Sequence, residues 1–186
     1  ARTLELSEEE KELVRGFSLL SMKPMIYAAN VEEDALSGVE NNALVAQVRQ
    51  AAQKEGAEVV VVSAKVEEEL AQLEEEERTM FLNELGLESA GLDRLVEASY
   101  RLLGLISYLT AGPKEVRAWT IEKGTKAPQA AGKIHSDFEK GFIRAEIVTY
   151  EDLVACGSIA AAREKGLYRS EGKEYVIRKD EAIAFA

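Results

Sequence analysis

The chain has 186 residues, and its 46% hydrophobic content is enough to fill the core of one large domain or of two small ones. Lys and Arg number 23 against 34 for Asp and Glu, so the net charge is −11, which argues against nucleic-acid binding through overall charge. The excess is uneven, with 10 basic and 22 acidic residues in 1–104 but 13 and 12 in 105–186, and this asymmetry predicts two modules.

Cysteine content and hydropathy indicate the compartment. The single cysteine, Cys156, cannot form an internal disulfide, and no apolar run approaches the roughly 20 residues that span a bilayer. The chain opens on an acidic, helical stretch instead of a secretory signal, so we expect a cytoplasmic protein without a membrane anchor. Because Ala1 stands in place of Met, we also expect a processed or cut fragment.

A helix is predicted near the N-terminus. Ser7 is a candidate N-cap, and Glu10 completes the S-x-x-E pattern of a capping box. The stretch Leu13–Phe17 supplies an apolar face, and we expect Pro24 to end the helix.

Two continuous apolar runs of strand length follow, Met25–Ala29 and Val59–Val62. Runs without polar alternation are typical of strands buried on both faces of a parallel sheet. Between them, apolar residues recur at helical spacing over Leu44–Ala52, and Gly56 is placed to end that helix. The pattern predicts a strand–helix–strand unit. Because a two-stranded parallel sheet is not stable by itself, we expect this unit to be the end of a larger α/β domain.

Two helices are expected after the second strand, an acidic one over Glu67–Arg78 and another over Leu92–Leu103. From Ile106 onwards the pattern changes to short strands and turns. A helix beginning at Thr125 and ending at Gly141, packed on a mixed sheet, describes an α+β domain of the β-grasp, or ubiquitin-like, type. The strands are expected at Ile106–Thr110, Val116–Ile121, Phe142–Val148, Tyr168–Ile177 and Ala182–Phe185, with a turn at Gly112-Pro113 and a short helical patch at Tyr150–Lys165.

Two polar motifs follow the predicted parallel strands. Asn30 comes after the first strand, and Ser63-Ala64-Lys65 comes after the second. Because ligands of a doubly wound sheet bind at the carboxyl ends of its strands, both motifs are expected on one rim. Nucleotide-binding G domains use two loops at this place, an N-K-x-D loop that reads the base and an S-A-K loop that supports it. Taken alone, the N-x-x-E spacing of Asn30 and Glu33 is weak evidence, because acidic residues are abundant here.

Longer motifs carry a resemblance to a known family. They are ANVEED, SAK, ELGLESAGLDRLVEASYRLLGLISYLTAG, KEVRAWTI and APQAAGKIHSDFEKGFIRAEI, and the last is the most specific. The chain resembles the C-terminal half of the YchF family, Obg-like ATPases of the translation-factor class of P-loop proteins. The resemblance implies the end of a helical coiled-coil insertion in 1–22, the C-terminal part of the nucleotide-binding G domain in 23–104, and a β-grasp TGS domain in 105–186.

The family prefers ATP to GTP, and the first loop offers a physical reason. Guanine presents two donors, N1–H and the 2-amino group, which the N-K-x-D aspartate accepts together. Adenine has an acceptor at N1 and no amino group at C2, so a carboxylate there would lose its hydrogen bonds, at a cost of about 1–3 kcal/mol. Here Glu33 replaces the aspartate, Asn30 can bond the N6/N7 edge of adenine, and Val31 can contact the amino group through its backbone. The nucleotide-binding residues that the resemblance implies are Asn30, Val31, Glu33, Ser63, Ala64 and Lys65.

The chain contains no G-x-x-x-x-G-K-[ST] loop to hold phosphates. In the family, that loop and the residues that hold Mg²⁺ precede the N-x-x-E loop. The resemblance therefore implies an ATP hydrolase that uses ATP and Mg²⁺ for the parent protein, whereas this chain alone is expected to be inactive. No catalytic or metal-binding residue is assigned within it.

The resemblance also implies a partner. We expect the ribosome, its large subunit or RNA, to be contacted through the TGS domain, and we expect no membrane and no DNA partner. Seven basic residues give that domain a modest local excess that could meet RNA or could be ordinary surface charge. The alternative function is a non-enzymatic RNA- or protein-binding module that uses the β-grasp domain. The seven basic residues are Lys114, Arg117, Lys123, Lys126, Lys133, Lys140 and Arg144.

Four further features have simple structural interpretations. His135, the only histidine, is expected to pack or to make a structural hydrogen bond, because one histidine makes no metal site. Cys156 is expected to fill a core, and Trp119 is expected in the core or on the domain surface more than as a base-stacking platform. The acidic stretch Glu67–Arg78 is most simply a solvated helix face.

Overall fold

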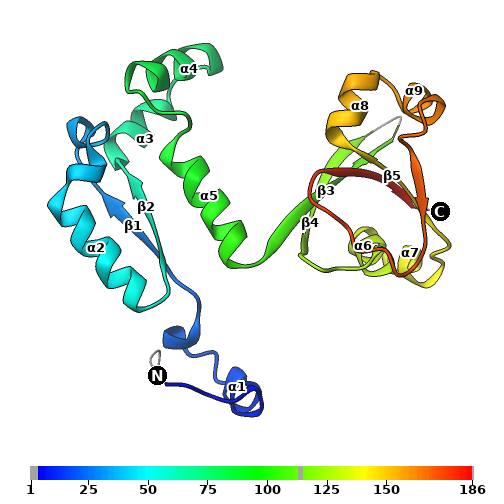
Figure 1. Ribbon diagram of the computed structural model, residues 1–186, viewed down its shortest axis with the longest axis horizontal. Helices are drawn as coiled ribbons and strands as arrows, with labels where there is room; N and C mark the ends of the chain where they lie inside the picture. The colour runs from blue at the N-terminus through cyan, green and yellow to red at the C-terminus, as the bar shows by residue number, and fades with distance from the viewer. Residues whose placement is uncertain (1–3, 113–114, 186) are drawn as a thin grey trace. The chain divides into compact units, whose positions relative to one another are not determined.

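The computed structural model describes residues 4–112 and 115–185. The chain forms two compact units, Ala1–Leu102 and Leu103–Ala186, whose helices and strands are labelled in Figure 1. The predicted turn at Gly112-Pro113 lies partly outside the described residues, and Lys114 lies outside them. Within the described ranges, no helix is both long enough and apolar enough to cross a bilayer.

The first unit begins with helix α1, Glu8–Arg15. The predicted capping box is confirmed, since the Ser7 hydroxyl accepts from the Glu10 backbone N–H at 3.3 Å and the Glu10 carboxylate accepts from the Ser7 N–H at 2.9 Å. The predicted end of the helix is wrong. The chain leaves the helical conformation well before Pro24, and Ser18 adopts a left-handed φ of 49° that no helix continues through.

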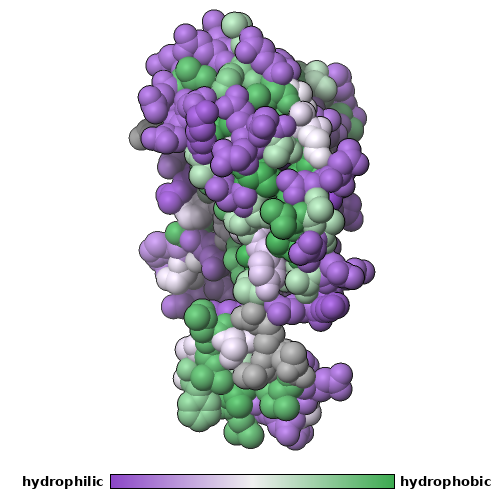
Figure 2. Space-filling view, turned by 90° about the vertical axis from the view of Figure 1, so that its left-hand side faces the viewer, coloured by the Kyte–Doolittle hydropathy of each residue, from purple (hydrophilic) through white to green (hydrophobic). Residues whose placement is uncertain are grey.

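The apolar side chains of this first segment are exposed. Leu13, Phe17 and Leu20 are 77%, 73% and 80% exposed, and no residue of α1 is buried. Figure 2 shows the resulting hydrophobic surface at the bottom of the view, over α1 and the turn that follows it. The apolar face expected on this helix is therefore present, but no described residue covers it.

The predicted strand–helix–strand unit is confirmed. Strand β1 is Ile26–Asn30, helix α2 is Ala43–Lys54, and strand β2 is Glu58–Val62. The strands pair in parallel, with Asn30 opposite Val62, so both end at the same level of the sheet. In Figure 1, α2 lies on one side of the two strands and α5, Gly91–Leu102, lies on the other.

The single acidic helix predicted over Glu67–Arg78 is wrong, because the structure has two helices there. Helix α3 is Ala64–Leu70 and helix α4 is Glu75–Glu84, and Glu74 between them is extended. The break has a packing reason. The break lets apolar side chains of both helices meet in one cluster. In one straight helix over the same residues, these side chains would be spread along the helix axis and could not meet. The cluster is formed by Leu36, Val66, Leu70 and Ala90, with Val31, Leu73, Phe81, Leu82, Leu85 and Leu87 packed against it.

The second unit contains a five-stranded mixed sheet in the order β4-β3-β7-β5-β6. Strands β3 and β7, the first and last strands of this unit, pair in parallel, and the other neighbours pair antiparallel. Its elements are β3 Leu105–Ala111, β4 Val116–Glu122, α6 Ala127–Ile134, α7 Ser136–Lys140, β5 Ala145–Thr149, α8 Tyr150–Cys156, α9 Ile159–Glu164, β6 Arg169–Glu171 and β7 Glu181–Phe185.

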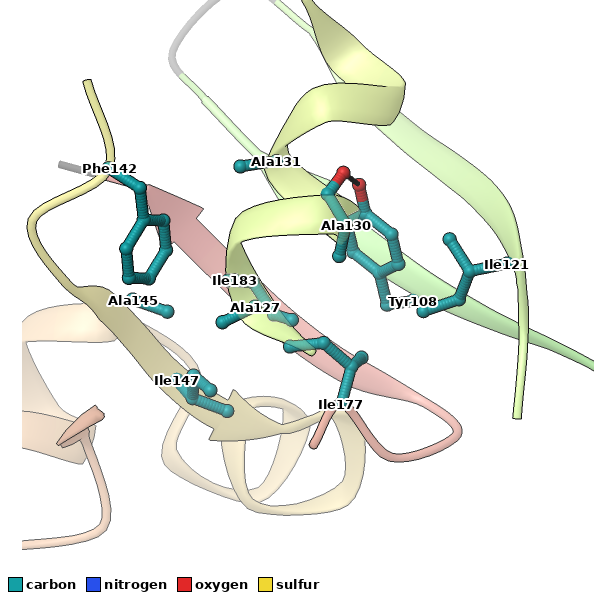
Figure 3. Packing of buried hydrophobic residues seen from close by; sticks show 10 residues of the cluster. All are labelled: Tyr108, Ile121, Ala127, Ala130, Ala131, Phe142, Ala145, Ile147, Ile177 and Ile183. Atoms are coloured by element: carbon teal, nitrogen blue, oxygen red, sulfur yellow. Dashed lines mark hydrogen bonds between the residues drawn. The ribbon is translucent and has the colours of Figure 1, made fainter. Parts of the chain in front are cut away.

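Both faces of this sheet are covered. Ile147 and Val148 are adjacent on β5, so their side chains point to opposite faces, and they belong to two different hydrophobic clusters. Figure 3 shows the larger cluster, which packs α6 against the sheet. At its centre the fully buried Tyr108 donates its hydroxyl to the Ala130 carbonyl at 2.8 Å. Cys156 is only partly buried and packs against the smaller cluster, so it lies at the edge of the core that it was expected to fill.

The helix predicted from Thr125 to Gly141 is broken at His135. This residue is extended, with φ −161° and ψ 142°, and its Nδ1 accepts from the Asp137 N–H at 3.2 Å, which caps α7. A structural hydrogen bond for His135 is thereby confirmed. Thr125 is not the cap of α6, because that position is Lys126.

Two strands of the second unit are shorter than predicted. Strand β5 begins at Ala145 instead of Phe142, and β6 covers only Arg169–Glu171 of the predicted Tyr168–Ile177. The reason lies in what the apolar residues contact. Phe142 and Ile177 are buried in the larger cluster from loops beside the sheet, so their burial does not require strand pairing.

Candidate functional site

Two loops leave the same edge of the two-stranded sheet in the first unit. Asn30 is the last residue of β1, and Ser63 directly follows β2. Because the strands are parallel and in register there, the loop after each begins on the same rim, as predicted. The groups that converge at this rim are the amide of Asn30, the backbone of Val31, and the start of α3 at Ala64.

The side chain of Asn30 connects the two loops. Its Oδ1 accepts from the backbone N–H of Ala64 at 2.9 Å, although the residues are 34 positions apart in the chain. An N–H donor must face the oxygen of the carboxamide, so this contact determines which way the amide points. The NH₂ group of Asn30 is therefore directed away from Ala64, and the side chain is exposed.

Val31 continues the pairing of the strands by one residue. Its N–H donates to the Val62 carbonyl at 2.9 Å, and its side chain packs against the cluster that contains Leu36 and Val66. The backbone donor of Val31 is thus used within the protein. Any backbone contact of Val31 with a ligand must therefore be made through its carbonyl oxygen.

Glu33 and Lys65 meet across the two loops. Lys65 Nζ lies 3.2 Å from Glu33 Oε2 and 3.9 Å from Glu69 Oε1. The hydrogen bond to Glu33, followed by the charges of Glu33 and Glu69, raises the pKa of Lys65. Glu33 opens a short 3₁₀ helix, Glu33–Ala35, which sets its side chain toward α3.

A hollow of about 460 Å³ lies beside this ion pair. Four carboxylates and one ammonium group line it, so its potential is negative and unfavourable for a phosphate. Among the residues that the structure describes, no group of three or more His, Cys, Asp or Glu side chains is arranged to hold a metal ion. The lining residues are Glu32, Glu33, Asp34, Ser37, Lys65, Glu84 and Leu85.

Sequence reasoning missed the residues that hold the second loop in place. Glu67, which was expected on a solvated face, accepts from the backbone N–H groups of Gly91 at 2.7 Å and Leu92 at 3.1 Å. It thereby caps α5 and ties α3 to it. Gly91 has no room for a side chain, since a Cβ there would lie 2.8 Å from Glu67 Oε1 and 2.9 Å from Val62 Cγ1. Ser63 is 2% exposed and starts α3, and no local pattern distinguishes Glu67 from its acidic neighbours.

The basic residues expected to meet RNA are not equivalent. Lys126 pairs with Glu174 at 2.5 Å, and Arg144 pairs with Glu146 at 3.0 Å. Arg117 instead stacks on Trp119, with its guanidinium carbon 4.2 Å from the ring centre. Trp119 packs partly against the larger core cluster and donates its indole N–H to Thr110, so its predicted role in packing is confirmed.

The comparisons with known proteins agree with one another. The family model YchF-GTPase_C, described as "Protein of unknown function (DUF933)", matches residues 105–186. The "Ribosome-binding ATPase YchF" of Bacillus subtilis (strain 168) is 56% identical over 185 residues, which cover 100% of this chain and 50% of that protein. The protein of the same name from Escherichia coli O157:H7 is 52% identical over 184 residues, covering 99% of this chain and 50% of that protein.

Solved structures give the same result. The Schizosaccharomyces pombe YchF GTPase matches with a TM-score of 0.84 at 36% identity, covering 100% of this chain and 49% of that chain. A GTP-binding protein from Pyrococcus horikoshii OT3 matches with a TM-score of 0.61 at 20% identity, covering 88% and 46%, which indicates a shared fold alone. The chain therefore spans about half the length of the curated relatives that it matches.

Proposed function

Since this chain belongs to the YchF family and matches the C-terminal half of its members, we propose that it carries the adenine-reading loops and a partner-binding domain of an ATP-hydrolysing, ribosome-binding protein. In this proposal, residues 1–22 end a helical insertion, 23–104 are the C-terminal part of a P-loop G domain, and 105–186 are a TGS domain of the β-grasp type. The parallel strand–helix–strand unit and the mixed sheet with α6 packed on it support these assignments.

The hydrogen bond between Asn30 and Ala64 is the observation that carries the proposal. It engages the amide oxygen of Asn30 with the backbone of Ala64, so the NH₂ group can donate to N7 of a purine. Both adenine and guanine have an acceptor at N7. Asn30 therefore binds purines without choosing between them, and the choice falls to neighbouring groups.

Two backbone donors at the rim are already engaged, and this favours adenine. The N–H of Val31 donates to Val62, and the N–H of Ala64 donates to Asn30. What Val31 presents is its carbonyl oxygen, which accepts from the 6-amino group of adenine. The 6-oxygen of guanine would instead face another acceptor, and an unpaired polar group of this kind costs about 1–3 kcal/mol. Glu33 occupies the position of the carboxylate that binds guanine in an N-K-x-D loop. Its carboxylate is engaged by Lys65, which supports the proposal that it does not bind guanine here.

The described residues fit a base but not phosphates. The hollow beside Glu33 and Lys65 is lined mainly by carboxylates, which repel a triphosphate. We therefore assign the phosphate-binding loop and the Mg²⁺ ligands to the other half of the family's length. When bound, Mg²⁺ would neutralise charge on the phosphates, and this chain would supply the recognition of the base. By itself the chain is expected to have no ATPase activity.

The second unit is proposed to contact the ribosome, through its large subunit or its RNA, in the cytoplasm. The supporting observation is Arg117, which is exposed on the edge strand β4 and held against Trp119 by stacking. A guanidinium fixed in this way suits a phosphate of RNA. Arg117→Ala should weaken co-sedimentation with ribosomes and reduce its dependence on salt, and unchanged co-sedimentation would remove this residue from the interface.

Calorimetry with base analogues tests the adenine-reading loops. The protein for this test is a fusion of this chain to the first half of the Bacillus subtilis relative. That relative is named an ATPase, whereas the Schizosaccharomyces pombe relative is named a GTPase, so the preferred nucleotide has to be measured. ATP should bind at least about tenfold more tightly than GTP. ATP analogues without N7 or without the 6-amino group should each bind more weakly, because they lack the partner of Asn30 or of the Val31 carbonyl.

Other outcomes would overturn the proposal. Tighter binding of GTP than of ATP would show that the loops do not read adenine. Absence of binding by either nucleotide would favour the non-enzymatic module, in which the strand–helix–strand unit is a scaffold and the second unit docks a partner.

A further inference from the structure

Lys65 holds the carboxylate of Glu33 by an ion pair across the two loops of the rim. Its Nζ contacts Glu33 Oε2 at 3.2 Å, whereas the amide of Asn30 faces Ala64. Glu33 and Lys65 are 32 positions apart and belong to different loops, so the contact is made by the fold and not by helical proximity.

Among the charged groups around Glu33, Lys65 is the one that attracts its carboxylate. Glu32, Asp34 and Glu84 line the same hollow, and each repels the Glu33 carboxylate. Lys65 is the cation among the lining residues, and its second partner, Glu69, is farther away at 3.9 Å. The hydrogen bond to Glu33 is also the main reason that the pKa of Lys65 is raised. Removal of the ammonium group would therefore release the carboxylate.

We propose that Lys65 is a specificity-determining residue, which keeps the base preference for adenine by restraining Glu33. The inference rests on the proposed function of the two loops. A released carboxylate can accept from N1–H and the 2-amino group of guanine, both of which are donors. Opposite adenine it faces the lone pair of N1, where it gains no hydrogen bond. Lys65 acts through Glu33 and is thus a positioning residue.

The test is the ratio of ATP to GTP affinity in the joined protein described above. Lys65→Met should lower that ratio about three- to fivefold, which is the most that the loss of an exposed ion pair can give, with GTP binding gained. Lys65→Arg retains a cation and should restore most of the preference. In the double variant Lys65→Met/Glu33→Gln the free charge is gone, so the preference for ATP should return.

Glu69→Gln is the matched control. It removes the other carboxylate near Lys65 without releasing Glu33, so the ratio should not change. If Lys65→Met leaves the ratio within about twofold of the unsubstituted protein, the inference is overturned while the adenine-reading loops stand. If the unsubstituted protein itself shows no preference for ATP, the result overturns the proposed function of the two loops, and with it the inference that rests on them.

A second measurement needs only this chain and no nucleotide. An NMR titration of the Lys65 side chain should give a pKa above that of an ordinary lysine, and Glu33→Gln should lower it. A Lys65 pKa that Glu33→Gln does not change would show that the pair does not form in solution, and would overturn the inference independently of nucleotide binding.

Discussion

Substitution of Asn30 can separate its structural role from its proposed role in binding. In Asn30→Asp, one carboxylate oxygen still accepts from the Ala64 N–H, which lies 2.9 Å from the present Oδ1. The NH₂ donor, however, is replaced by a second acceptor. In Asn30→Ala, both the acceptor for Ala64 and the donor for the ligand are lost. The two variants therefore predict different results for stability and for affinity.

The magnitudes follow from the geometry. The bond to Ala64 joins exposed groups, so its loss in Asn30→Ala should lower the free energy of unfolding of the first unit by about 0.5–1.5 kcal/mol. Asn30→Asp should leave that free energy within about 0.5 kcal/mol of the unsubstituted value. For binding, Asn30→Asp turns an acceptor toward N7, so ATP and GTP should both weaken at least about tenfold, with their ratio unchanged.

Two assays are needed. Urea unfolding followed by far-UV circular dichroism reports both units, whereas the fluorescence of Trp119, the only tryptophan, reports the second unit alone. A change seen by dichroism and not by fluorescence therefore belongs to the first unit. Calorimetry on the joined protein gives the affinities. Tight ATP binding by Asn30→Asp would refute the donor role of the amide. Equal destabilisation by Asp and Ala would refute the acceptor role.

Three further predictions concern packing and pH. Gly91→Ala places a Cβ 2.8 Å from a Glu67 carboxylate oxygen and 2.9 Å from a β2 side chain, so the first unit should lose about 1–3 kcal/mol in urea unfolding. Gly38→Ala, whose Cβ would meet nothing within 4 Å, is the control, and an equal loss in both would contradict the packing explanation. Tyr108→Phe removes the bond to the Ala130 carbonyl and should cost the second unit about 1–2 kcal/mol by tryptophan fluorescence, whereas an unchanged midpoint would show that the bond is not made. Burial raises the pKa of Tyr108 above its ordinary 10.0, so the unfolded chain loses the phenol proton first, and the free energy of unfolding of the second unit should fall as the pH rises above about 10. Tyr108→Phe should reduce this slope, and an identical slope would mean that other groups cause it.

Local patterns predicted the elements whose causes are local. The capping box at Ser7 depends on groups three residues apart, and the structure has it as predicted. The strands of the parallel pair and helix α2 follow from hydrophobic periodicity, and they lie within a residue or two of the expected bounds. The position of Asn30 and Ser63 on one rim was also predictable, because parallel strands end on the same side of a sheet.

Element breaks were not predictable from periodicity. The gap between α3 and α4 exists because Leu70 and Phe81 pack in one cluster, and periodicity within either segment is compatible with a continuous helix. The break at His135 likewise places an imidazole as a cap where the spacing of apolar residues indicated an uninterrupted helix. The first break follows from packing between two helices, and the second from a hydrogen bond between His135 and the backbone of Asp137, and the spacing of apolar residues carries no signal of either.

The sequence by itself determined the class of the two units, the motifs at the rim and the identity of the residues there. It did not determine what those residues contact. Asn30 with Ala64, Glu33 with Lys65, and Glu67 with Gly91 are 34, 32 and 24 positions apart, and each contact is made only when strands and helices have packed. Tertiary structure alone decided that the Asn30 amide turns its donor outward and that Glu33 turns to a lysine, because side-chain hydrogen bonds follow distances in space and not spacing in the chain.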